Sequence, residues 1–93
     1  MIRFEWSPVK AAVNEGKHGV RFVEATTVFG QVLTAYVPDP AHLVGEARFL
    51  AVGFSSRGRV LLISYTERDE AVRIISAREA TPRERRSYER RQR

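Results

Sequence analysis

The sequence predicts an α+β domain in which two N-terminal helices and one C-terminal helix pack on one face of a small antiparallel β-sheet. Three observations predict this fold. Apolar residues recur at helical spacing in the first 30 residues, strand-like runs separated by turn signals follow, and a helix-start signal stands near the end of the chain. With 93 residues and 43% hydrophobic residues, we expect a single domain over residues 1–93 with one modest core.

The N-terminal part is expected to hold one strand and a first helix. Residues 2–6, IRFEW, alternate like a short strand, and Ser7 followed by Pro8 is typical of a helix start. Gly16 or Gly19 should end this helix. Its apolar stripe, expected to face the core, consists of Val9, Ala12 and Val13.

A second short helix is expected over residues 21–29, with Gly30 closing it. Arg21 stands at its start, where it offers no side-chain acceptor for a cap. The aromatic residues expected in the core are Trp6, Phe22, Phe29 and Phe49.

Strands are expected at QVLTAYV (31–37), RFLAVGFS (48–55), VLLISYTE (60–67) and AVRIISAR (71–78). The last two should form a hairpin that turns at Asp69-Glu70. Because side chains alternate between faces, this turn sets which residues share a face. The expected cross-strand pairs are Glu67 with Val72, Thr66 with Arg73, and Leu61 with Arg78.

The C-terminal helix is expected to begin at Pro82, because Thr81 to Glu84 form a capping box with proline at the first helical position. Tyr88 is the one sizeable apolar side chain beyond that point. Such a helix needs charge pairs or a partner to hold it. Tyr88 is expected to dock the helix onto the body, or alternatively to stack on a base.

Positive charge is concentrated at the end of the chain. Of 16 basic and 11 acidic residues, residues 78–93 hold seven arginines and three glutamates. This asymmetry indicates a polyanion or an acidic protein as partner, with a solubilising tail as the alternative. The sequence lacks cysteine, a membrane-length apolar run and a signal peptide, which predicts a cytoplasmic protein without disulfides. No metal and no cofactor are expected, since two separated histidines make a poor ligand set.

An ordered set of short motifs resembles the BrnT family. They are FEW, KHGV.F.EA..VFG, S.RGR.L...YTER and RIISAREAT..ER..YE. The resemblance implies a RelE-like microbial ribonuclease architecture and a toxin of a type II toxin–antitoxin module. The implied activity is metal-independent RNA cleavage that stops translation. The implied partner is a BrnA-like ribbon-helix-helix antitoxin that represses the shared operon, so operator DNA is contacted only through the antitoxin.

RNA cleavage without a metal needs a base for the 2′-hydroxyl, an acid for the leaving oxygen and cations for the phosphate. The expected catalytic residues are His18, Glu67 and Arg78. His18 is the first candidate base or acid, or alternatively an ordinary helix-terminal histidine. Glu67 is the other candidate base, or a solvated carboxylate. Arg78 is expected to bind phosphate through its fork, or to pair with Glu79 or Glu84.

Further cations are expected to contact RNA, and each has a solvated surface role as its alternative. These candidates are Lys10, Lys17, Arg68, Arg73 and Arg83. Arg57, Arg59, Arg78 and Arg83 are expected to gather at one end of the sheet. Arg85 and Tyr88 are expected to bind the antitoxin. Two other function classes remain open, a non-catalytic RNA-binding module and a pure interaction protein, and RNA cleavage products would distinguish the ribonuclease from both.

Overall fold

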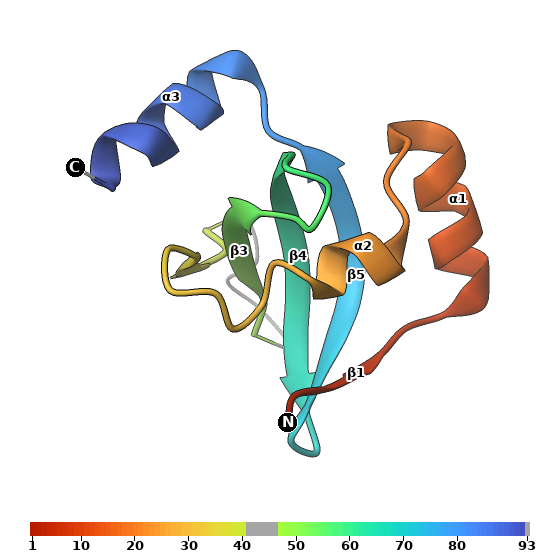
Figure 1. The fold of residues 1–93 in the computed structure, drawn as a ribbon. Helices are drawn as coiled ribbons and strands as arrows, with labels where there is room; N and C mark the ends of the chain where they lie inside the picture. The colour runs from red at the N-terminus through yellow and green to blue at the C-terminus, as the bar shows by residue number, and fades with distance from the viewer. Residues whose placement is uncertain (41–46, 93) are drawn as a thin grey trace.

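The structure, a computed structural model, describes residues 1–40 and 47–92. In chain order it contains β1 (Arg3–Glu5), α1 (Pro8–His18), α2 (Phe22–Thr26), β2 (Ala35–Pro38), β3 (Phe49–Phe54), β4 (Val60–Arg68), β5 (Ala71–Glu79) and α3 (Pro82–Arg91). This arrangement confirms the predicted α+β fold (Figure 1). The prediction that all helices share one face of the sheet is wrong, because Tyr88 of α3 packs against Phe54 on the face opposite the core.

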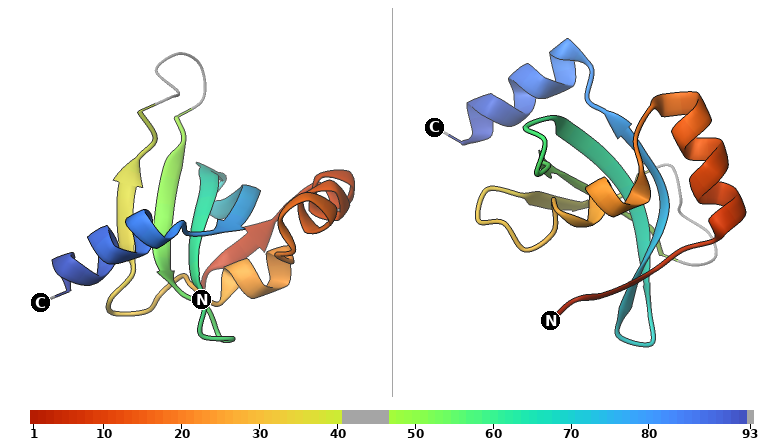
Figure 2. Two further views of the ribbon diagram at one scale, coloured as in Figure 1. Left: turned by 90° about the horizontal axis from the view of Figure 1, so that it is seen from above. Right: turned by 45° about the vertical axis from the view of Figure 1, so that its right-hand side comes forward.

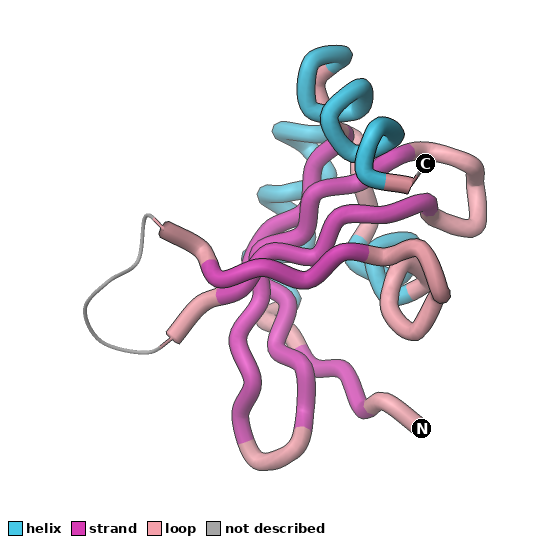
Figure 3. The backbone as a smooth tube through the Cα atoms, turned by 90° about the vertical axis from the view of Figure 1, so that its left-hand side faces the viewer, coloured by secondary structure: helices cyan, strands magenta, loops and turns pink. Residues whose placement is uncertain are grey.

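The strands form one five-stranded sheet in the order β1-β5-β4-β3-β2. Strands β2 to β5 form an antiparallel meander, and β1 runs parallel to the first part of β5. Figures 1 and 2 place α1 and α3 to either side of the end of the sheet where β5 stops. Figure 3 shows the β4–β5 hairpin extending beyond the rest of the sheet at the other end.

The β4–β5 hairpin turns where the sequence predicted. Asp69 and Glu70 form a two-residue loop with φ values of 51° and 64°, the left-handed conformation that such tight turns require. Close to this loop the predicted register is confirmed. Glu67 pairs with Val72, and Thr66 pairs with Arg73.

A β-bulge interrupts the hairpin farther from the turn. Tyr65 pairs with Ile74, but its neighbour Ser64 pairs with Ser76, so Ile75 has no partner across the ladder. An extra residue on one strand shifts the alternation of its side chains relative to the other strand.

The bulge makes the predicted pairing of Leu61 with Arg78 wrong, because Arg78 pairs with Leu62. The predicted faces of this part of β5 are therefore exchanged. Ala77 pairs with Ile63 and is fully buried in the core. Arg78 consequently points to the opposite face of the sheet.

Helix α1 begins and ends at predicted signals. The Ser7 hydroxyl accepts a hydrogen bond from the Lys10 amide at 3.3 Å, and the helix ends at Gly19, whose φ is 68°. The predicted apolar stripe is wrong, however. Val9 and Val13 are 73% and 62% exposed, and the buried residue of α1 is Asn14.

Asn14 anchors α1 to the exposed edge of β5. Its Nδ2 donates to the carbonyl oxygens of Val20 and Ala77 at 3.0 and 2.8 Å, and its Oδ1 accepts from the Ala77 amide at 3.0 Å. Strand β1 ends at Glu5, opposite Arg73, so it does not reach Ala77. The Asn14 side chain thus takes the place of a neighbouring strand at this position.

We expect Asn14→Ala to lower the free energy of unfolding by about 2–3 kcal/mol, because it leaves the buried amide and carbonyl of Ala77 without partners. The control is Val13→Ala, which makes a similar change in helix propensity at an exposed site and should stay within about 0.5 kcal/mol. Urea unfolding followed by Trp6 fluorescence measures both. Equal stabilities of the two variants would show that Asn14 does not anchor the helix.

Helix α2 is shorter than expected, since the helix ends at Thr26 and turns continue to Gly30. As predicted, Arg21 at its start makes no side-chain capping bond. The predicted aromatic residues lie in or beside the core. Phe22 is buried, with the Trp6 ring 5.9 Å away between centroids, and Phe29 and Phe49 both pack against Tyr65.

Strand β2 also begins later than predicted, at Ala35 instead of residue 31. The preceding residues form a turn in which the Thr34 hydroxyl donates to the Val28 carbonyl at 2.7 Å. This turn lies directly against β3. A Cβ atom at Gly53 would lie 2.6 Å from Thr34 Oγ1, so the close approach requires glycine there.

Helix α3 begins with the predicted capping box, in which Thr81 and Glu84 bond to each other's backbone amides. Tyr88 docks it onto the body, as expected. This side chain is 4% exposed, its hydroxyl donates to the Leu33 carbonyl at 2.8 Å, and its ring lies 5.8 Å from the Phe54 ring.

Candidate active site

The two faces of the sheet differ in how they are covered. The core face packs against α1 and α2, whereas the opposite face carries a cavity of about 340 Å³. Residues from α1, from the ends of β2 and β3, and from β4 and β5 line it. They are His18, Asp39, Arg48, Leu50, Leu62, Ser64, Ile75, Ser76 and Arg78.

Arg78 reaches this cavity because of the β-bulge and is held by an ion pair. Its two terminal nitrogens donate to the two carboxylate oxygens of Glu84 at 2.8 and 2.9 Å, and one also donates to the Glu79 carbonyl at 3.3 Å. The predicted alternative, pairing with Glu84, is thus present. Both side chains are 37% exposed, so the pair lies at the surface, within reach of a ligand.

The Arg78–Glu84 pair keeps both groups charged. The hydrogen bond from Arg78, followed by the bond from the Thr81 amide, lowers the pKa of Glu84 to about 2. The same contact raises the pKa of Arg78. The cavity therefore presents a permanent cation whose fork is already aligned for a two-oxygen acceptor.

His18 is the last residue of α1 and lines the same cavity. Its position follows from the side chain that anchors α1. Asn14, one turn earlier, bonds to Ala77, which is the residue before Arg78. The two predicted catalytic residues are thus brought together by the bonds of the Asn14 side chain to the backbone of β5, although 60 positions separate them in the chain.

Glu67 lies away from the cavity, in the exposed end of the hairpin. It stands five residues along β4 from Leu62, the partner of Arg78, which corresponds to roughly 16 Å. Arg68 is exposed at the same end. The structure therefore joins His18 with Arg78 and separates both from Glu67.

The other predicted RNA contacts lie outside this cavity. Arg73 faces Thr66, as predicted, and its guanidinium lies 3.5 Å from the Glu5 carboxylate. Lys10 and Lys17 line a second cavity, of about 260 Å³, between α1 and β5. Arg83 is exposed in the first turn of α3.

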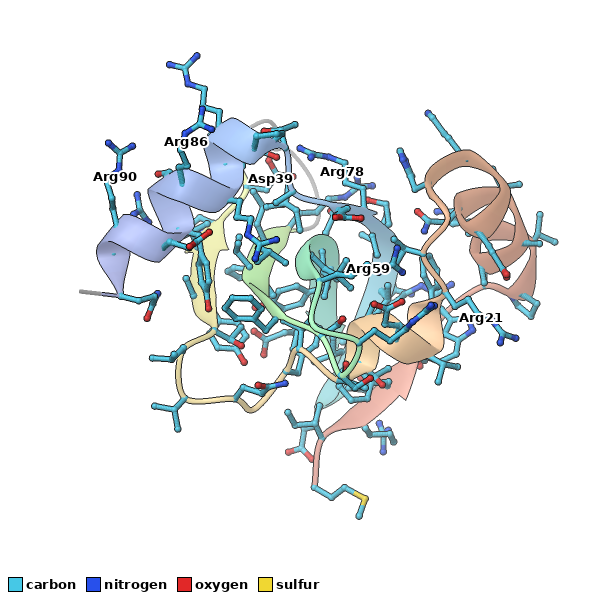
Figure 4. The ribbon with its side chains drawn as sticks, turned by 45° about the horizontal axis from the view of Figure 1, so that its top comes forward. Arg21, Asp39, Arg59, Arg78, Arg86 and Arg90 are labelled. Atoms are coloured by element: carbon cyan, nitrogen blue, oxygen red, sulfur yellow. The ribbon has the colours of Figure 1, made fainter. Side chains whose placement is uncertain are left out.

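The predicted cluster of four arginines is divided between two sites. Arg59 makes two hydrogen bonds to Glu24 of α2, one of them 3.0 Å from Nε to Oε2, and the Arg57 guanidinium lies 4.0 Å from the same carboxylate. Arg78 instead pairs with Glu84 of α3. Figure 4 shows Arg59 toward α2 and Arg78 toward the start of α3.

Glu24 is a buried carboxylate that the sequence analysis did not single out. It is 7% exposed, accepts a bond from the Ser55 hydroxyl at 2.7 Å, and has its pKa lowered chiefly by the bond from Arg59. Arg59 also donates to the Gly19 carbonyl at 3.3 Å. This network fixes the turn between β3 and β4 against the residue that follows His18.

Sequence reasoning also missed Asp39 and Arg48, which border the cavity at the ends of β2 and β3. The Asp39 amide donates to the Arg48 carbonyl at 2.9 Å, extending the pairing of Pro38 with Phe49. The predicted strand over residues 31–37 ends before Asp39. The strand register, which a single sequence does not provide, was the signal needed to find both residues.

Among the described residues, no group of three or more histidine, cysteine, aspartate or glutamate side chains is arranged to hold a metal ion. In the same ranges, no helix is long and apolar enough to cross a membrane. The groups that the cavity offers to a ligand are an imidazole, guanidinium groups, hydroxyls and one carboxylate.

Residues 6–84 match a family model described as the ribonuclease toxin BrnT of type II toxin–antitoxin systems. The matched segment contains His18, Arg78 and Glu84 and covers most of the chain. The chain belongs to the BrnT family. This result confirms the resemblance seen in the sequence motifs and identifies a ribonuclease toxin family. Type II systems pair such a toxin with an antitoxin, and RNA is the substrate of a ribonuclease.

The crystal structure of the Brucella abortus ribonuclease toxin BrnT has a similar fold. The TM-score is 0.69, with 20% sequence identity over 87% of this chain and 99% of that chain. At this identity the similarity supports the fold of the BrnT-family chain and not individual residue roles. No curated protein sequence matches the chain.

Proposed function

We propose that this BrnT-family chain is a metal-independent RNA endonuclease that acts in the cytoplasm and stops translation. The observation that carries the proposal is that His18 and Arg78 line one cavity. An imidazole that can accept a proton and a guanidinium that can bind two phosphate oxygens therefore border the same cavity. Membership of the BrnT family indicates RNA cleavage, and the imidazole and guanidinium groups of the cavity suit this reaction.

The proposed reaction is attack of a ribose 2′-oxygen on the adjacent phosphorus. His18 takes the proton of the 2′-hydroxyl, and the new P–O bond forms as the bond from phosphorus to the 5′-oxygen breaks. The leaving 5′-oxygen takes a proton from solvent, and the products are a 2′,3′-cyclic phosphate and a 5′-hydroxyl. Arg78 stabilises the negative charge that accumulates on the non-bridging oxygens.

RNA has to compete with Glu84 for Arg78 in this scheme, because both terminal nitrogens of Arg78 bond to that carboxylate. Glu84 keeps a second partner when it is displaced, since it also accepts from the Thr81 amide at 2.8 Å. A phosphate, like a carboxylate, accepts two parallel bonds from an arginine fork. Exchange of one acceptor for the other therefore leaves the start of α3 capped.

The remaining cations suit a path for the RNA backbone. Arg73 lies opposite Thr66, on the same face of the sheet as the cavity. Lys10 and Lys17 lie along α1, beside the second cavity. Arg68 and Arg83 lie farther out, on the hairpin end and on α3. We propose phosphate contacts for these five residues, with the binding strength depending on salt.

Incubating the purified chain with a labelled single-stranded RNA in excess chelator tests the proposal. We expect fragments that end in 2′,3′-cyclic phosphate, and arrest of protein synthesis when the chain is expressed without antitoxin. Binding without fragments would indicate the alternative, a non-catalytic RNA-binding module. Cleavage that requires added magnesium would contradict the metal-independent mechanism.

We further propose that the antitoxin is a ribbon-helix-helix protein and that the toxin meets operator DNA only through it. Arg85 remains a proposed contact, although it bonds to Glu89 at 3.0 Å and lies 5.9 Å from the Phe54 ring centre. Tyr88 is covered by the body, so an antitoxin could contact it only by displacing α3. The accessible cations of this helix include Arg86 and Arg90, which point away from the body in Figure 4.

A further inference from the structure

Helix α1 turns two valines toward solvent. Val9 and Val13, four residues apart and therefore on one side of the helix, are 73% and 62% exposed. The fold does not use them, because α1 is held to the body by Asn14 and by Ala11. Single exposed valines are ordinary, so the pair acquires significance only from its surroundings.

The two valines form one wall of the cavity between α1 and β5, whose volume is about 260 Å³. Ile75, the bulged residue of β5, faces them from the other side. His18, Ile75 and Ser76 line both this cavity and the proposed catalytic cavity. A ligand seated between α1 and β5 would therefore extend to His18.

The charges around the valines select the kind of ligand. Lys10 and Lys17 border the same cavity, so an occupant needs apolar side chains for the valines and carboxylates for the lysines. RNA fits the lysines and not the valines, which offer neither a charge nor a flat ring for stacking. A second copy of this chain would bring lysines against lysines.

We infer that Val9, Val13 and Ile75 form the docking site for an apolar, acidic segment of the antitoxin protein. The inference rests on the proposed function in its choice of partner and goes beyond it in locating the contact on α1. The segment, once seated, would cover His18 and close the catalytic cavity to RNA. Val9 and Val13 would then serve neutralisation alone, whereas the neighbouring lysines and His18 would serve both RNA and the antitoxin.

The double variant Val9→Asn/Val13→Asn tests the inference, with Val23→Asn as the matched control. Asparagine is neutral and has a helix propensity close to that of valine, so charge and helix stability change little. Val23 is 63% exposed, like Val13, but belongs to α2 and lines neither cavity. The readouts are calorimetric affinity for the purified antitoxin of the same module and the rate of RNA cleavage.

We expect the double variant to bind the antitoxin on the order of 100-fold more weakly, with cleavage within about twofold of the unmodified chain and the control unchanged in both. Unchanged antitoxin affinity would overturn the inference. So would lost cleavage with retained antitoxin binding, which would assign the surface to RNA, or a dimer of the free chain that the double variant dissociates. If the unmodified chain cleaves no RNA, the proposed function fails, while the binding comparison still tests the docking site.

Discussion

Replacing Arg78 with alanine is expected to reduce RNA cleavage by about 10²–10³-fold, the usual cost of removing one group that stabilises a developing negative charge. Arg78 is a cavity residue whose guanidinium is already held in a two-oxygen geometry, by Glu84 at 2.8 and 2.9 Å. Initial rates of cleavage of a short labelled RNA measure the effect. The fold should persist, because an ion pair this exposed contributes about 1 kcal/mol or less.

Two control variants separate phosphate binding from the structural role of the ion pair. Arg86→Ala removes the same charge from the outer face of α3 and should leave cleavage nearly unchanged (Figure 4). Glu84→Gln weakens the pair while keeping Arg78, so it should retain most of the activity. A loss in Glu84→Gln as large as in Arg78→Ala would mean that the pair, and not phosphate binding, is what cleavage requires.

Replacing His18 with glutamine is expected to slow cleavage by about 10²–10⁴-fold, the range for general acid–base catalysis. RNA affinity should be unchanged, because glutamine removes the proton acceptor and keeps a polar side chain of similar length. Single-turnover cleavage rates and equilibrium RNA binding measure the two effects separately.

Glu67→Gln tests the other candidate base. Glu67 lies roughly 16 Å along β4 from Leu62, the residue that pairs with Arg78. We expect the single-turnover rate of this variant to match that of the unmodified chain. The opposite pattern, with His18→Gln active and Glu67→Gln inactive, would place the reaction at the hairpin end and contradict the proposed cavity.

The sequence by itself determined the elements whose signals are local. Helix starts at Ser7-Pro8 and at Thr81 to Glu84 were predicted correctly, because a capping bond is completed within four residues. The tight turn at Asp69-Glu70 was predicted for the same reason, and so was the register next to it. The choice of His18 and Arg78 as catalytic candidates also came from residue chemistry and from the family motifs.

Only the tertiary structure decided which side chains meet. The extra residue Ile75 exchanges the faces of the later part of β5 and turns Arg78 toward the cavity. No local sequence pattern predicts this bulge, because the residues around Ile75 are compatible with either strand register.

The orientation of α1 was decided in the same way. Asn14 is buried and the valines are exposed because the unpaired edge of β5 needs hydrogen-bonding partners at Ala77. Asn14 and Ala77 are 63 positions apart, so these hydrogen bonds form only once the chain has folded.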